Sequence, residues 1–246
     1  MGGLEYVLAA SDETIGDWIQ EHTYKVVSLA PNIFMHVNKY IQMHVGKNLI
    51  NWFIKPFMDF IGKFKLEPFC IDMTFISLPI IRYWNLNDKY LQHLLPGFNM
   101  RIGVDDIDAF ETHANHYSSG TSLRNLWHAF QWMKQSEDDL KLYKYDFGTA
   151  ENMERYNQAT PPSYAIEKIK ADITIIGATV DHYSPLEGLI EFNKITGDNV
   201  KLVVFEDWGH VTFIIPLHHE KLFKVFDEVF NYEIPNISFE EDQVLD

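Results

Sequence analysis

Two residues in the last third of the chain have the types and the order needed for nucleophilic catalysis. Asp181 follows the apolar run ADITIIGA (171–178), and His210 follows the apolar run KLVVFE (201–206). A carboxylate can hold an imidazole in one tautomer and stabilise its charged form, while the imidazole takes a proton from a serine hydroxyl. Asp before His is also the chain order of the last two members of a Ser–Asp–His triad. The pair therefore predicts an acid and a base that still need a nucleophile.

Asp181 and His210 could instead have structural roles, and other carboxylates could take the place of Asp181. An Asp after a strand is commonly a helix cap, and a His in a loop is commonly a surface residue. Asp172 precedes its strand and Asp198 lies in the loop that leads into the next one, so both fall at the wrong end. Asp207 lies at the right end but only three residues before His210, so we expect it to shape that loop.

The elements around this pair alternate between strands and helices, which predicts an α/β fold. A helix opened by Pro185 and ended by Gly197 separates the two strands, and a helix around 219–231 follows them. This cadence predicts parallel strands with right-handed crossovers, at whose carboxyl ends reactive side chains gather. Earlier in the chain we expect a helix from Leu4 to about Ser11, a strand buried on both faces at 25–31, and a helix at 122–134 with one apolar side. The apolar side of that last helix consists of Leu123, Leu126, Trp127, Phe130 and Met133.

Composition excludes several classes of function. The net charge of −15 argues against a nucleic-acid partner, because phosphate binding needs a basic face. The single cysteine, Cys70, excludes an internal disulfide and is expected to be a small buried apolar residue. No signal peptide is visible, and the most apolar stretch, 49–64, carries too many charges to span a membrane.

Three further groups of residues are weak candidates for binding sites. His113 and His116 lack a third metal ligand, and we expect the acidic residues Asp105, Asp106 and Asp108 to form a loop rather than a calcium site. The residues His218 to Glu220 are expected to open the last helix, exposed to solvent. No metal or organic cofactor is therefore implied.

Five segments resemble the acid lipase family, which includes the gastric and lysosomal lipases. They are NHYSSGTSLRNLWHAFQ (115–131), YDFG (145–148), YNQATPPSY (156–164), VDHYSPLEG (180–188) and WGHVTFI (208–214). The resemblance covers roughly residues 1–230 and is weakest over 32–110. It implies an α/β-hydrolase fold, Asp181 and His210 as catalytic acid and base, and cleavage of a lipid carboxylic ester such as a triacylglycerol or a steryl ester. Ser118 stands where the family usually has proline, and Cys70 alone stands where the family has several cysteines.

The first residues resemble the end of a nucleophile elbow. In the motif G-x-S-x-G the serine sits on a sharp turn between a strand and a helix. Met1-Gly2-Gly3-Leu4 fits this motif from the position just after the serine, with Gly2 small because the helix passes close to the strand. We therefore expect the C-terminal portion of the hydrolase without its nucleophile, with the Met1 amide as an oxyanion-hole donor of the intact protein. Ser119 and Ser122 lie outside any such motif, and Ser28 is expected to be core.

We divide the chain into four parts on these grounds. They are the start of the hydrolase core (1–31), a mostly helical cap or lid insertion rich in aromatic residues and Met (32–118), the C-terminal core (119–235) and an acidic tail (236–246). The insertion is either plain helical core or a lipid-facing cap, which would allow transient contact with a membrane or lipid droplet. No oligomeric state is indicated.

Two other functions remain open at this stage. One is a non-catalytic lipid-binding or interaction module derived from a lipase, and the other is a generic esterase of small esters. We expect the isolated chain to be inactive toward esters. We also expect it to dissolve poorly, because the strand at 25–31 would be an apolar edge.

Overall fold

The computed structural model describes residues 2–34, 36, 56, 70–71, 99–101, 103–106, 109, 121–136 and 138–230. Several predicted features lie outside these residues. They are the Met1 oxyanion donor, the side chain of Cys70, His113, His116, Ser119, the acidic tail and nearly all of the cap insertion.

A three-stranded parallel sheet forms the centre of the described structure. Its strands are β1 (Val26–Leu29), β4 (Ile173–Ala178) and β5 (Val200–Phe205), in the order β1-β4-β5. Ile173 pairs with Val26 on one side and with Val200 on the other. The central strand β4 is buried along its whole length. This parallel sheet with crossover helices is the partial α/β-hydrolase fold that the sequence predicts.

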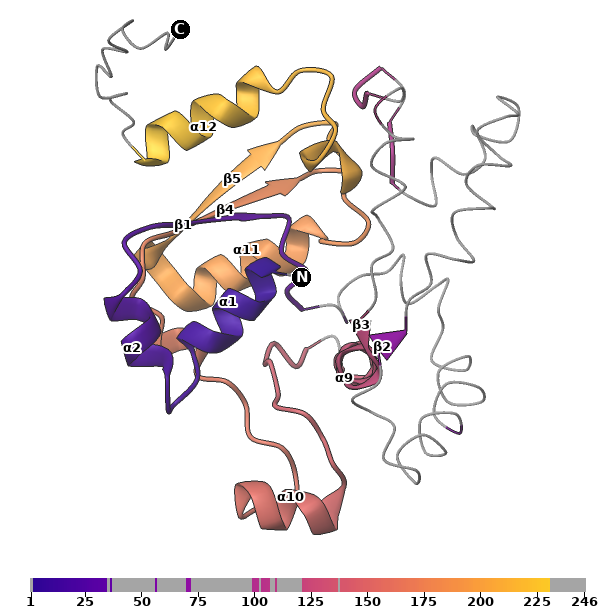
Figure 1. The fold of residues 1–246 in the computed structure, drawn as a ribbon, viewed down its shortest axis with the longest axis vertical. Helices are drawn as coiled ribbons and strands as arrows, with labels where there is room; N and C mark the ends of the chain where they lie inside the picture. The colour runs from indigo at the N-terminus through magenta and orange to yellow at the C-terminus, as the bar shows by residue number, and fades with distance from the viewer. Residues whose placement is uncertain are drawn as a thin grey trace, which may run out of the picture.

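Helices cover both faces of this sheet. Ile173 and Ile175 of β4 pack in one apolar cluster with helix α1 (Gly2–Ala10) and helix α11 (Leu186–Thr196). Ile176 and Ala178 pack in a second cluster, on the side of helix α12 (Glu220–Phe230). Figure 1 shows α12 on one side of the sheet and α1 with α11 on the other. The alternation of β4 side chains thus separates two helical layers, as expected for a strand buried on both faces.

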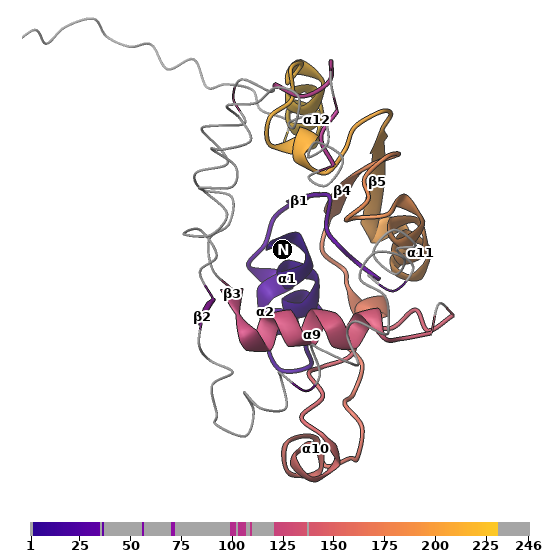
Figure 2. The ribbon, with the colours of Figure 1, turned by 90° about the vertical axis from the view of Figure 1, so that its right-hand side faces the viewer.

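The remaining elements lie around this core. They are α2 (Gly16–Glu21), the antiparallel pair β2 (Cys70–Ile71) and β3 (Thr121–Ser122), α9 (Leu123–Met133), α10 (Thr149–Tyr156), and the 3₁₀ helices η3 (Ile166–Lys168), η4 (Gly197–Asn199) and η5 (Val211–Phe213). Helix α10 projects away from the sheet in both views (Figures 1 and 2). In the part of the chain that the structure describes, no helix is long and apolar enough to cross a membrane.

Strand β1 differs from the prediction that it is buried on both faces. Only Ser28 of this strand is buried, and Leu29 is 37% exposed. The reason is topological, since β1 stands at the edge of the sheet formed by the described strands. The expectation of an apolar edge at this strand agrees with the structure.

The close approach of α1 to β1 occurs at Gly3 and not at Gly2. A Cβ atom at Gly3 would lie 1.9 Å from the Ser28 hydroxyl oxygen, whereas one at Gly2 would meet nothing within 4 Å. The role assigned to Gly2 concerns the strand before the elbow, which is not among the described residues, so that role stays a prediction. Gly3 is the position at which only a missing side chain lets the helix lie against the strand.

The buried side of α9 also differs from the predicted apolar stripe. Leu123 and Trp132 are buried, but Leu126 is 37% exposed. The Trp132 indole N–H donates to the Tyr143 carbonyl at 2.9 Å, which turns the helix toward the segment that follows it. Ser122 is the N-cap of α9 and accepts from the Asn125 N–H, so this serine has a structural role.

Candidate active site

Asp181 and His210 lie side by side in the loops that follow β4 and β5. The last residues of these strands, Ala178 and Phe205, are paired, so both loops start from the same edge of the sheet. His210 Nδ1 lies 2.9 Å from Asp181 Oδ2. The Asp181 side chain is 0% exposed and that of His210 is 29% exposed. The loops therefore present a buried carboxylate behind an imidazole that solvent can reach.

The Asp181 carboxylate is fixed by its own turn. Its Oδ1 atom accepts hydrogen bonds from the backbone N–H groups of Tyr183 and Ser184, both at 2.8 Å. The Ser184 hydroxyl in turn donates to the Pro31 carbonyl at 2.6 Å, which ties this turn to the loop after β1. One carboxylate oxygen thus organises the turn that leads into α11, and the other is aimed at His210. The N-cap position of α11 itself is occupied by Pro185.

The contact between His210 Nδ1 and the Asp181 carboxylate assigns the tautomer of the imidazole. Because an ionised carboxylate only accepts, Nδ1–H is the donor and the Nε2 atom of the neutral ring carries a lone pair. Among the described residues, no hydrogen bond to Nε2 is found. The Tyr183 ring lies beside the imidazole, with 5.3 Å between ring centroids. The neutral imidazole therefore presents its Nε2 lone pair on the side away from Asp181.

The competing carboxylates have other environments. Asp207 has a left-handed backbone conformation (φ 60°), and its N–H donates to the Thr179 hydroxyl, so it shapes the loop as expected. Its carboxylate lies 3.7 Å from the Arg101 guanidinium. Asp172 lies at the opposite end of β4, 4.0 Å from Lys25. Asp198 lies in η4, before β5.

A residue that the sequence analysis missed connects the two loops. Asn99 is 3% exposed and hydrogen-bonds to the backbone of both, although it comes from the segment assigned to the insertion. The same segment pairs with the chain after His210, since Asp106 N–H donates to the Ile215 carbonyl and Leu217 N–H donates to the Val104 carbonyl. No local signal marks Asn99, because its partners are 81 to 111 residues away.

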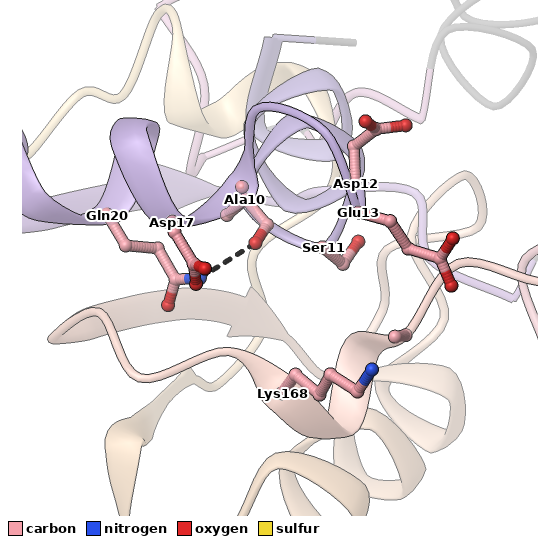
Figure 3. A pocket seen from close by; sticks show the side chains of 9 residues that line it. Ala10, Ser11, Asp12, Glu13, Asp17, Gln20 and Lys168 are labelled. Carbon is pink, nitrogen blue, oxygen red and sulfur yellow. Dashed lines mark hydrogen bonds between the residues drawn. The ribbon is translucent and has the colours of Figure 1, made fainter.

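A pocket of about 250 Å³ lies elsewhere, at the turn between α1 and α2 (Figure 3). Its lining includes Ser11, Asp12, Glu13, Asp17 and Lys168, and the Gln20 amide donates to the Ala10 carbonyl beside it. Asp12 is paired with Lys144 at 2.9 Å. Ser11, Asp12 and Gln20 hydrogen-bond within the turn that joins α1 to α2. Among the described residues, no group of three or more His, Cys, Asp or Glu side chains is arranged to hold a metal ion.

Comparisons with known proteins find lipases among the relatives of this chain. No protein-family model matches the chain. Relatives include lipase member N of Mus musculus, 30% identical over 52% of this chain, and a putative lysosomal acid lipase/cholesteryl ester hydrolase of Crotalus adamanteus, 27% identical over 49%. Gastric triacylglycerol lipase of Mus musculus is 24% identical over 63% of the chain. These similarities support an acid lipase-like family. These matches span about a third of the relatives' own length (32%, 29% and 33%).

One acidic residue of this acid lipase-like chain differs from its predicted setting. We expect Asp105 to lie in an acidic loop, but it is 1% exposed and its Oδ2 atom accepts from the Arg101 N–H. Burial raises the pKa of this carboxyl above 3.8, although the Thr212 hydroxyl and the Arg101 N–H oppose the shift. Thr212 also accepts from the Gly209 N–H at 2.9 Å, so Asp105 lies behind the loop that carries His210.

The raised pKa of Asp105 predicts that replacing it by asparagine, which cannot ionise, stabilises the fold by an amount that grows with pH. A carboxyl whose folded pKa exceeds its unfolded value stabilises the fold below the unfolded pKa, and this contribution is lost as pH rises through the folded pKa. The variant Asp105→Asn cannot ionise, so its free energy of unfolding should improve relative to the unsubstituted chain as pH rises from about 4 to about 7. Denaturant unfolding of both proteins at a series of pH values measures this difference. A difference that stays constant across this pH range would contradict the prediction.

Proposed function

We propose that this chain supplies the acid and the base of a serine hydrolase that cleaves carboxylic esters of lipids. The observation that carries the proposal is the 2.9 Å hydrogen bond between His210 and the buried Asp181, at the carboxyl ends of neighbouring parallel strands. Open parallel sheets place reactive groups at this edge. Asp before His in the chain is the order of an α/β-hydrolase triad.

The roles follow from the positions of the two imidazole nitrogens. Nε2 of His210 takes the proton of a serine hydroxyl while the serine oxygen attacks the ester carbonyl carbon, and Asp181 stabilises the imidazolium formed. The imidazolium then returns the proton to the leaving alcohol as the ester C–O bond breaks. Water then attacks the acyl-serine carbonyl carbon while the same nitrogen takes its proton. That proton passes to the serine oxygen as the acyl C–O bond breaks, which releases the carboxylic acid and restores the serine. The serine comes from outside the described residues, since none of their hydroxyls hydrogen-bonds Nε2.

The relatives support a lipid ester as the substrate class. Their names are those of lipases, one of them a triacylglycerol lipase and one a putative acid lipase/cholesteryl ester hydrolase. Both substrates are carboxylic esters of long acyl chains. The same acid–base pair serves either alcohol, because it acts on the ester bond and not on the rest of the molecule.

Acid release from triolein, cholesteryl oleate and p-nitrophenyl acetate tests this function. It is measured for the 246-residue chain and for the longest expressed product that contains it. We expect turnover of long-chain esters wherever the nucleophile is present, lowered by at least about 10³-fold in the variant His210→Ala. The control is His218→Ala, an exposed histidine of the following loop, which should retain activity.

Each other outcome identifies a different function. If no product hydrolyses any ester, the proposed function is wrong, and fatty-acid binding without turnover would identify a lipid-binding module. Turnover of p-nitrophenyl acetate alone would assign an esterase of small esters.

A further inference from the structure

The buried side chain of Asn99 makes three hydrogen bonds that join the loops of Asp181 and His210. Its Oδ1 atom accepts from the His182 N–H at 2.9 Å and from the His210 N–H at 2.8 Å. Its Nδ2 group donates to the Val180 carbonyl at 2.9 Å. Val180 and His182 are the two neighbours of Asp181, so one side chain holds the backbone on both sides of the carboxylate and the backbone of the imidazole.

Only a primary carboxamide of this length can make this set of contacts. The carbonyl oxygen of Asn has two lone pairs, which here receive two N–H groups, and the amide nitrogen supplies the donor for a carbonyl. A carboxylate would place an acceptor against the Val180 carbonyl, and an apolar side chain would leave two N–H groups and one carbonyl without these partners. Backbone groups that lose their partners in this way destabilise the fold.

The backbone at Asn99 is adapted to the same contact. Its φ of 56° lies in the left-handed region, which Asn tolerates better than most residues. Its carbonyl oxygen lies only 2.0 Å from the position that a Cβ atom at Gly209 would take. A glycine beside His210 therefore lets the Asn99 segment approach the base from the backbone side.

We propose that Asn99 is a positioning residue that sets the separation of Asp181 and His210. Two loops that follow different strands can move relative to each other. The Asn99 carboxamide restricts this motion because it hydrogen-bonds to the backbone of both loops. The consequence for hydrolysis rests on the proposed function, but the structural role of Asn99 does not. A change of about 1 Å in such a pair lowers the rate by about 10²-fold.

The experiment compares Asn99→Ala with a matched buried asparagine elsewhere. Asn152 is 1% exposed and also makes three hydrogen bonds, to Phe147, Asp146 and Ala159 around α10, so Asn152→Ala loses a similar number of contacts. Two quantities are measured by NMR on the full chain with isotope-labelled histidine. They are the hydrogen-bonded Nδ1–H signal of His210 and the exchange rates of the His182 and His210 backbone amides.

In Asn99→Ala we expect the Nδ1–H signal to be lost and both amides to exchange at least about tenfold faster. Asn152→Ala should lower stability without either change. The role is overturned if Asn99→Ala retains the signal and the protection of both amides, or if Asn152→Ala loses them equally. If Asn99→Ala does not fold, Asn99→Asp decides. It keeps the acceptor for the two N–H groups, so it should protect both amides, and fast exchange of both would overturn the role.

Kinetics separate this proposal from the proposed function. In a product that hydrolyses esters, Asn99→Ala should lower kcat by about 10²-fold with KM within about threefold. A change in the NMR signals without hydrolysis in any product overturns only the proposed function. Unchanged NMR signals overturn the role of Asn99 whether or not esters are cleaved.

Discussion

Replacing Asp181 by asparagine is expected to lower kcat for ester hydrolysis by about 10⁴-fold while the fold stays intact. The reason lies in the two N–H groups of Tyr183 and Ser184, which both donate to Oδ1. In Asp181→Asn these donors hold the amide oxygen at that position, so the amide nitrogen faces Nδ1 of His210. An amide N–H can only donate, which forces the imidazole to carry its proton on Nε2. The base then has no lone pair toward the nucleophile.

Three measurements separate this effect from a loss of structure. Acid release gives kcat, denaturant unfolding gives the free energy of unfolding, and NMR of isotope-labelled histidine reports which nitrogen carries the proton. The control Asp172→Asn lies at the other end of β4, where its ion pair with Lys25 is long and its side chain is 60% exposed. It should leave kcat within about twofold, because exposed ion pairs contribute little. A kcat of Asp181→Asn above a tenth of the unsubstituted value would contradict the assigned role.

The strands and helices of the sheet could be predicted because their signal is local. In a run such as ITIIGA the only polar side chain is that of Thr174, which indicates a strand covered on both faces, and β4 is fully buried. The proline and glycine that flank α11 likewise act on their own backbone, and Pro185 and Gly197 bound that helix. The meeting of Asp181 with His210 then follows from parallel pairing, since the carboxyl ends of neighbouring strands share one edge. Their catalytic role stays a prediction.

Features that depend on distant neighbours could not be predicted in this way. The exposure of Leu29 depends on which strand stands at the edge of the sheet, and the apolar run that contains it is the same in either case. The exposure of Leu126 depends on which side of α9 packs against the rest of the chain, and the buried Trp132, which donates to the Tyr143 carbonyl, lies on the packed side. Asp105 and Asn99 are ordinary polar residues in sequence, and become buried because their segment packs against residues 209–217. Asp and Asn are equally common in exposed loops, so the sequence around them gives no local sign of such buried contacts.

Replacing Gly209 by alanine is expected to damage both stability and catalysis. The added Cβ atom would lie 2.0 Å from the Asn99 carbonyl oxygen and 3.2 Å from both the carbonyl carbon and the Cγ of Asn99. The nearest of these atoms belongs to the backbone, so no rotation of a side chain relieves the contact. Overpacking of this kind costs about 1–3 kcal/mol, and occasionally more. Denaturant unfolding of Gly209→Ala measures this loss, with Gly2→Ala as a control that should stay within about 0.5 kcal/mol.

The catalytic part of the Gly209 effect should depend on Asn99. When the Asn99 backbone moves away from the new methyl group, its Oδ1 atom leaves the His210 N–H, which belongs to the next residue after Gly209. In the background Asn99→Ala that hydrogen bond is already absent, so Gly209→Ala should lower kcat by a smaller factor than in the unsubstituted protein. Residues that act through one shared contact are non-additive in this way. Equal factors in the two backgrounds would show that the glycine and the asparagine position His210 independently, and would contradict the coupling inferred from the backbone contact.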